Sequence, residues 1–186
     1  DTVRRQRQMC IRDSDKNVTI KNLPRVKDID TMLNLLKSLG RKITFKNNKK
    51  IATIAKGKKN NYFAPYSLVK TMRAGILVLG PLLAKNKKAK VSSPGGCSIG
   101  VRPIDIHLKA ISKLGVKIQI EKGYVNAKAQ KGLVGSEIRF SKISVGATEN
   151  SILAACLAKG ATIIKNCAIE PEIKDLTNFL KTAGAK

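Results

Sequence analysis

The chain has 186 residues and a formal net charge of +25 at pH 7, with 37 basic residues against 12 acidic ones. This length suits one domain or two small ones and allows a sizeable core, while no apolar run approaches the ~18 residues that a membrane-spanning helix needs. The polar opening does not resemble a signal peptide, and four unpaired-looking cysteines with one histidine argue against a zinc site. We therefore expect a cytoplasmic protein with reduced thiols, no metal and no membrane association.

The positive charge comes mainly from lysine, which supplies 28 of the basic residues and is scattered along the whole chain. Arginine, the usual reader of bases and phosphates, is scarce, and seven tyrosines and phenylalanines do not make an obvious base-stacking platform. We interpret the lysines as a solvated surface that attracts anionic small substrates. Nucleic acid is not the expected partner, although a basic nucleic-acid-binding or scaffolding module stays the alternative.

Residues 1–15 match no helix or strand period and have no counterpart later in the chain. We expect them to be a disordered or non-native segment, and Cys10 within them receives no role. Residues 16–186 are then the folded domain.

Three later segments, 28–40, 103–115 and 172–184, share one pattern. Each ends on a glycine, and apolar residues stand eleven, four and one positions before it, which is the spacing of one helical face. The glycine predicts a helix end in the left-handed conformation. The pattern indicates three copies of one supersecondary unit within a domain.

Strand-like and helix-like stretches separate the three copies. A further helix is expected in each of the first two units, interrupted at Gly80-Pro81 in the first and ended by Gly160 in the second. Residues 122–123 are the expected hairpin turn. The segments themselves are strands 42–45, 50–54, 90–92, 116–120, 124–129 and 162–165, and helices 67–83 and 147–158. The repeated β-α-β-β-α order predicts an α+β domain with helices packed inside sheets.

The segment 94–103 reads PGGCSIGVRP and is the most reactive-looking part of the chain. Its glycines let the backbone approach a ligand, and Pro103 suits the first turn of a helix. A helix start beside Arg102 is a natural seat for an anion, and a thiol such as Cys97 near positive charge is a usable acid or nucleophile. An ordinary turn with a buried structural cysteine is the alternative.

Four ordered motifs carry a family resemblance: residues 64–74, 94–107, 144–150 and 170–176. Together they resemble the UDP-N-acetylglucosamine 1-carboxyvinyltransferases of the enolpyruvyl transferase family, over about residues 18–186. The resemblance implies an inside-out α/β barrel of two domains, each built from three βαβαββ units. It further implies that this chain covers about one domain, without the partner domain and without the family's Lys-Asn pair that helps to hold phosphoenolpyruvate.

The same resemblance implies the site residues. Cys97 matches the loop cysteine that protonates the enolpyruvyl methylene, and Arg102 matches an arginine at the edge of both substrates. Arg73 matches another nucleotide-sugar contact, although Gly75 replaces the family's usual serine. The implied substrate-binding set is Arg73, Arg102, Pro103, Ile104, Asp105, Ile106, Lys142, Ile143, Ser144 and Val145.

The implied reaction transfers the enolpyruvyl group of phosphoenolpyruvate to the 3-hydroxyl of UDP-N-acetylglucosamine and releases phosphate, as the first committed step of peptidoglycan synthesis. No metal or organic cofactor is implied. From the residues themselves, Ser144 is a plausible helix cap, His107 is expected in helix packing away from the ligand, and Cys156 is expected in the core. This chain alone is expected to be inactive. The alternative is an inactive fragment that keeps only part of the nucleotide-sugar site.

Overall fold

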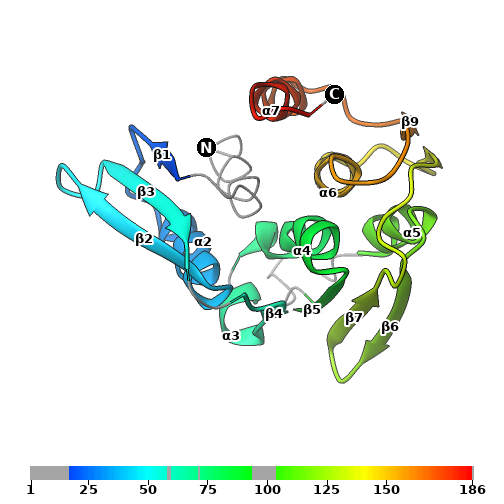
Figure 1. Cartoon of the computed structure of the whole chain (residues 1–186), viewed down its shortest axis with the longest axis horizontal. Coiled ribbons are helices and arrows are strands. Elements are labelled where there is room, and N and C mark those ends of the chain that lie inside the picture. Colours follow the sequence, from blue (N-terminus) through cyan, green and yellow to red (C-terminus); the bar gives the residue numbers. More distant parts are fainter. Residues whose placement is uncertain (1–16, 58–59, 71, 94–103, 186) are drawn as a thin grey trace.

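The structure, a computed structural model, describes residues 17–57, 60–70, 72–93 and 104–185. Helices and strands are mixed along the chain (Figure 1). In order they are β1 (Val18–Ile20), α2 (Lys27–Ser38), β2 (Arg41–Lys46), β3 (Ile51–Lys56), β4 (Phe63–Ala64), α3 (Tyr66–Val69), the 3-10 helix η1 (Arg73–Val78), α4 (Leu79–Asn86), β5 (Lys88–Ser92), α5 (Asp105–Lys113), β6 (Lys117–Glu121), β7 (Tyr124–Lys128), β8 (Glu137–Arg139), α6 (Val145–Ala155), β9 (Ile163–Lys165) and α7 (Pro171–Thr182).

The strands form three small sheets, ordered β1-β3-β2, β4-β5-β7-β6 and β8-β9. In the middle sheet β5 runs parallel to β4 and antiparallel to β7, and the β8-β9 pair repeats the parallel arrangement of β4 and β5. The hairpin between β6 and β7 turns through Lys122 and Gly123, both with positive φ, as a two-residue type I′ turn requires. The predicted turn is therefore confirmed.

The three predicted repeat helices are α2, α5 and α7. Gly40, Gly115 and Gly184 follow them with φ of 95°, 84° and 100°, which confirms a left-handed glycine after each helix. The apolar positions counted back from these glycines are buried, except that Ile104 is half-buried and Ala183 is exposed. The spacing of the apolar residues in the sequence therefore correctly predicted which face of each helix packs against the core.

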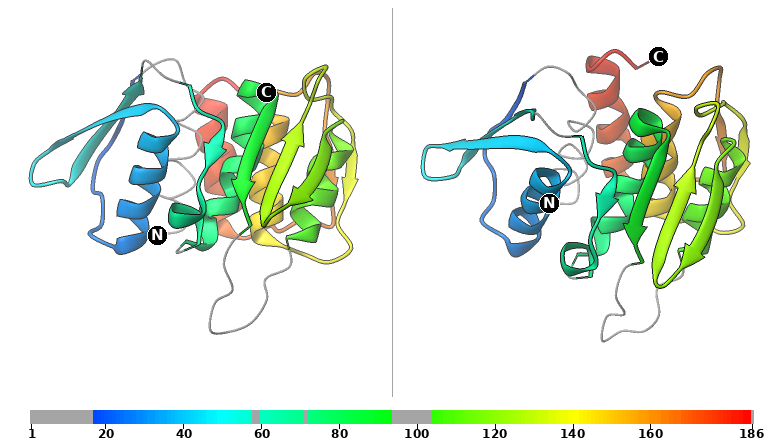
Figure 2. Two further views of the ribbon diagram at one scale, coloured as in Figure 1. Left: turned by 90° about the horizontal axis from the view of Figure 1, so that it is seen from below. Right: turned by 60° about the horizontal axis from the view of Figure 1, so that its bottom comes forward.

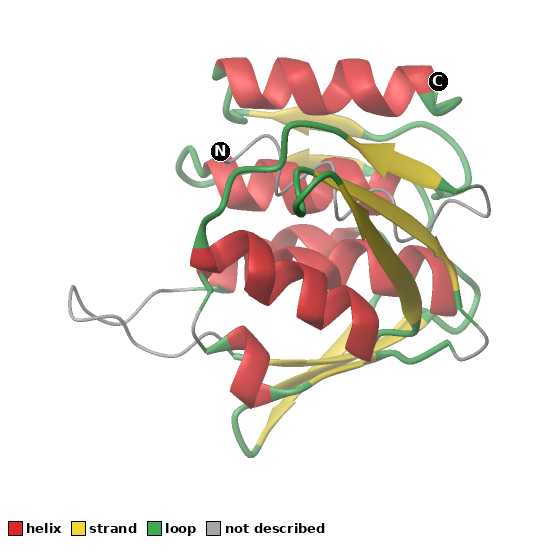
Figure 3. Ribbon diagram, turned by 90° about the vertical axis from the view of Figure 1, so that its left-hand side faces the viewer, coloured by secondary structure: helices red, strands yellow, loops and turns green. Residues whose placement is uncertain are grey.

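Helix α6 lies at the centre of the domain. Its residues 147–151 are all buried, together with Leu153 and Ala154, and it packs against η1, α4, α5 and α7. The sheets lie around this group of helices (Figures 1 and 3). This arrangement confirms the expected α+β fold with helices inside sheets.

The first unit departs from the prediction of one helix over 67–83. The chain forms α3, turns through Met72 in an extended conformation, and continues as η1 and α4. The turn folds η1 back onto α3 so closely that a Cβ on Gly75 would lie 2.9 Å from Cγ1 of Val69. Pro81 does not interrupt the helix, because it occupies the first turn of α4, where a missing N–H costs no helical hydrogen bond.

Sequence analysis missed β1, β4 and β8, which have only two or three residues each. A segment of two or three residues is too short to show an alternation of apolar and polar residues. Such a strand forms because neighbouring strands offer it hydrogen-bond partners. Within the described ranges, no helix combines the length and the apolar character that crossing a bilayer would require.

Three lysines lie side by side across the outer face of the middle sheet. Lys128 of β7 is in register with Lys88 of β5 on one side and with Lys117 of β6 on the other, and all three are exposed. Side chains directly opposite each other on one sheet face are about 5 Å apart, so these ammonium groups repel each other. This triplet is called the lysine row below.

We predict that Lys128→Glu raises the free energy of unfolding by about 0.5–1 kcal/mol in dilute buffer, because the new carboxylate is flanked by two ammonium groups. Screening should shrink the gain in high salt. Urea unfolding at low and high salt measures both effects. Lys42→Glu is the matched control, since Lys42 is an exposed strand lysine opposite Ala55; an equal gain in this control would contradict the explanation.

Candidate active site

The predicted site residues fall on three elements and one segment that the structure leaves undescribed. Cys97, Arg102 and Pro103 lie outside the described residues, and so does the side chain of Arg73, whose backbone begins η1. The remaining residues lie at the start of α5 and just before α6. The geometry of the site is therefore built from these two helix starts and from η1.

At the start of α5, the predicted residues divide between core and surface. Ile106 is buried and Ile104 is half-buried, while Asp105 is exposed in the first turn. Ile104 is the N-cap residue of α5, and its apolar side chain cannot accept a hydrogen bond from the N–H groups of the first turn. The carboxylate of Asp105 favourably complements the positive end of the helix dipole.

The start of α6 is a capped turn. Oγ of Ser144 accepts a hydrogen bond from the Ala147 N–H at 3.3 Å, which confirms the predicted cap. Oγ1 of Thr148 donates to the Ser144 carbonyl at 2.8 Å and accepts from the Ala168 N–H at 3.1 Å. The turn is thus anchored to the segment before α7, while Lys142 and Ile143 in front of it are exposed.

A single buried side chain, that of Asn150 in α6, connects the predicted elements. Its Oδ1 accepts from the Gly80 N–H of α4 at 2.8 Å, and its Nδ2 donates to the Ile76 carbonyl of η1 at 3.2 Å. Nδ2 also lies 3.3 Å from Nδ1 of His107 in α5. Gly80 permits this approach, because a Cβ there would lie 2.6 Å from Oδ1 of Asn150.

Sequence analysis did not single out Asn150. Its signal was weak: asparagine is a mediocre helix former, so its place among the apolar residues of a predicted helix hints at a buried polar role. Which groups it would pair with could not be predicted, since Ile76, Gly80 and His107 lie far from it in sequence.

His107 packs across the junction of α5 and α6, as expected for a helix-packing residue. A Cβ on Gly146, in the first turn of α6, would lie 3.2 Å from Cε1 of the imidazole. Burial lowers the pKa of His107 to about 4, and the nearby Asp105 carboxylate offsets part of that effect. The neutral imidazole therefore lies beside the turn of Ser144 and Val145, closer to the predicted site than the sequence suggested.

The starts of α5 and α6 lie at the same end of the domain as the end of β5 (Figure 2). Ser93, after β5, donates its N–H to the Gly123 carbonyl at 2.8 Å, so this end of the sheet is fixed. Residues 94–103 join β5 to α5 in the sequence. The described ends of that connection therefore border the two helix starts that carry the other predicted residues.

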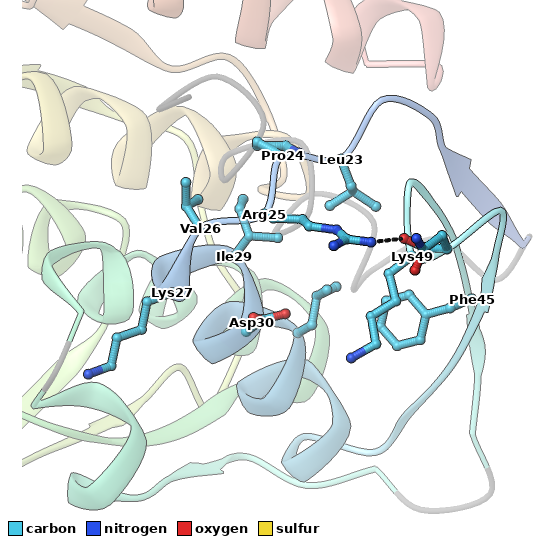
Figure 4. A pocket seen from close by; sticks show the side chains of 11 residues that line it. Leu23, Pro24, Arg25, Val26, Lys27, Ile29, Asp30, Phe45 and Lys49 are labelled. Atoms are coloured by element: carbon cyan, nitrogen blue, oxygen red, sulfur yellow. Dashed lines mark hydrogen bonds between the residues drawn. The ribbon is translucent and has the colours of Figure 1, made fainter.

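One cleft lies away from the predicted site residues. A cleft of about 430 Å³ lies between the start of α2 and the β2–β3 turn, where the Arg25 guanidinium donates to the Asn48 carbonyl at 3.1 Å (Figure 4). None of the predicted site residues lines it. A smaller one of about 240 Å³ lies between α5 and residues 138–141 and is lined in part by Ile106.

The remaining thiols have structural positions. Cys156 follows α6 and packs, half-buried, against the core that was expected to enclose it, and burial raises its pKa. Cys167 is also half-buried against the core. Among the residues that the structure describes, no group of three potential metal ligands comes together.

We predict that His107 makes the fold less stable in acid. The unfolded chain takes up a proton near pH 6.5 and the folded chain only near pH 4, so stability falls as the pH drops through this window. The loss should be on the order of 3 kcal/mol larger in the native chain than in His107→Gln. Urea unfolding of both proteins between pH 7 and pH 4 measures this difference; identical pH profiles would contradict the assignment.

Comparison with known proteins gives a consistent result. The sequence model for EPSP synthase (3-phosphoshikimate 1-carboxyvinyltransferase) matches residues 13–186. The chain is 67% identical over 171 residues to a UDP-N-acetylglucosamine 1-carboxyvinyltransferase of Pelagibacter ubique strain HTCC1062, covering 92% of this chain and 40% of the relative. It is 53% identical over 173 residues to the enzyme of the same name from Helicobacter pylori, covering 93% of this chain and 41% of that relative.

Solved structures agree on the fold. The enolpyruvyl transferase NikO from Streptomyces tendae superimposes with a TM-score of 0.84 at 18% identity, over 99% of this chain and 43% of that one. An EPSP synthase from Acinetobacter baumannii gives 0.71 at 18% identity, over 94% and 40%. The chain spans about two fifths of the length of the curated relatives that it matches. It belongs to the EPSP synthase (3-phosphoshikimate 1-carboxyvinyltransferase) family.

Proposed function

We propose that this chain supplies the nucleotide-sugar side of an enolpyruvyl transferase site that a further domain completes. The observation that carries the proposal is the 67% identity to a UDP-N-acetylglucosamine 1-carboxyvinyltransferase, a relative more than twice as long as the matched segment. The adjacent starts of α5 and α6 support it, because two helix N-termini on a chain with a net charge of +25 favour an anionic ligand.

In the proposed reaction the 3-hydroxyl of UDP-N-acetylglucosamine adds to C2 of phosphoenolpyruvate while C3 accepts a proton. Phosphate then leaves as the double bond re-forms with loss of a proton from C3, so the enolpyruvyl ether and inorganic phosphate are the products. Cys97 is the proposed proton donor to C3, because a thiol ionises close enough to neutral pH for that task. The reaction would serve peptidoglycan synthesis in the cytoplasm, and through it cell shape and division.

The proposed roles of the binding residues follow from the resemblance to the enolpyruvyl transferases. Arg102 and Arg73 are proposed to bind phosphate groups, for which the guanidinium fork is suited. Pro103, Ile104, Asp105 and Ile106 would bind the uridine nucleotide through the helix start of α5. Lys142, Ile143, Ser144 and Val145 would hold its other side, at a turn that the Ser144 cap and Thr148 stabilise.

The test is a chimera in which residues 18–186 replace the matched segment of the Pelagibacter relative. We expect turnover from the chimera, none from the 186-residue chain alone, and a loss of at least about 100-fold in kcat for Cys97→Ala in the chimera, the range for losing a general acid. Cys156→Ala is the matched control, since that thiol packs against the core. Undiminished turnover of Cys97→Ala would refute the role of the thiol.

The lysine row favours one other function, the binding of a polyanion such as nucleic acid. Its three ammonium groups are exposed on one sheet face, with Lys88 above the Tyr62 ring at 4.2 Å from the centroid. Titration of the isotope-labelled chain with UDP-N-acetylglucosamine and, separately, with duplex DNA at physiological salt discriminates the two. We expect the sugar nucleotide to shift amide signals around Asp105 and Ser144. Salt-sensitive DNA binding at the lysine row without any sugar-nucleotide effect would favour the alternative.

A further inference from the structure

Asn150 is the polar residue at the centre of the packed helices. Its side chain is fully buried and pairs with three other elements: α4 through Gly80, η1 through Ile76, and α5 through His107. A buried amide needs hydrogen-bond partners inside the protein. Here one amide holds together the elements that carry Arg73, Asp105 and Ser144.

The partners determine how the amide is oriented. The Gly80 N–H can only donate, so it must face the Oδ1 of Asn150, and the Ile76 carbonyl can only accept, so it must face Nδ2. Rotating the amide by half a turn would place a donor against a donor and an acceptor against an acceptor. The second proton of Nδ2 is then left for Nδ1 of His107, 3.3 Å away.

This orientation determines the tautomer of His107. An Nδ1 atom that accepts a hydrogen bond carries no proton, so the neutral imidazole must carry its proton on Nε2. The Nε2 edge lies against the first turn of α6, because a Cβ on Gly146 would be 3.5 Å from Nε2. A ring held in this way links the start of α5 to the turn that follows Ser144.

We propose that Asn150 is a positioning residue for the nucleotide-sugar site: its amide holds His107 in the Nε2–H form and thereby sets the spacing between the starts of α5 and α6. The identity of the ligand rests on the proposed function. The hydrogen bond from Asn150 to His107 and the resulting tautomer do not depend on it. The low pKa of His107 agrees with it, since burial already keeps the ring neutral at physiological pH.

The first experiment reads the tautomer directly. His107 is the only histidine of the chain, so long-range ¹H–¹⁵N spectra of the labelled 186-residue protein contain one set of imidazole signals. We expect the shifts of a neutral ring protonated on Nε2 at pH 7. A ring protonated on Nδ1, or on both nitrogens, would overturn the inference whether or not the chain binds a sugar nucleotide.

The second experiment uses Asn150→Asp. The carboxylate can still accept from the Gly80 N–H, but it offers no proton to the Ile76 carbonyl or to His107, so the ring must take up a proton to pair with it. We expect the pKa of His107 to rise by more than one unit and the affinity for UDP-N-acetylglucosamine to fall at least tenfold. In the chimera, KM for this substrate should rise more than kcat falls.

Ser151→Ala is the matched control. Ser151 is the next residue of α6 and is equally buried, but its hydroxyl donates within the helix to the Ala147 carbonyl at 2.7 Å. The control should leave the tautomer and the affinity unchanged. An Asn150→Asp protein with native affinity, or a Ser151→Ala protein with the same loss, would overturn the positioning role. Failure of the native chain to bind UDP-N-acetylglucosamine, with the Nε2–H tautomer observed, would instead refute the proposed function.

Discussion

The burial of α6 is the constraint on which the rest of this domain depends. A helix surrounded by η1, α4, α5 and α7 has no solvent face along its middle, so any polar group there must find partners inside the protein. Asn150 finds them in three different elements. The same contacts that satisfy a buried amide therefore fix the relative placement of the helix starts that carry the predicted binding residues.

Small residues make this packing possible. Gly80 lets the start of α4 approach α6, and Gly146 lets the imidazole of His107 lie against the first turn of α6. A Cβ at Gly80 would lie 2.6 Å from Oδ1 of Asn150, too close to be accommodated without a shift of α4 or α6, and a Cβ at Gly146 would lie 3.2 Å from Cε1 of His107. The contacts at Gly80 and Gly146 therefore determine both how closely the helices pack and how the starts of α5 and α6 lie relative to each other.

The positive charge of the domain and its two adjacent helix starts both favour the binding of an anion. Helix starts favour anions only within their first turn, whereas a net charge of +25 acts over a longer range. Under the proposed function, diffuse lysine charge draws the anionic nucleotide sugar toward the protein, and the helix starts of α5 and α6 bind it. The cost is repulsion on the surface itself, most visible in the lysine row of the middle sheet.

The sequence by itself determined the three repeat helices, their glycine ends, the position of the hairpin turn at residues 122–123, and the Ser144 cap, because each depends on residues within one helix or one hairpin. It did not determine the path of residues 66–86, the shortest strands, or the role of Asn150. Those features depend on residues distant in sequence: η1 folds back on Val69, and Asn150 pairs with Ile76 and Gly80 more than sixty positions away. Only the tertiary structure could decide them, since a local pattern shows that a side chain is polar or small but not which distant backbone it meets.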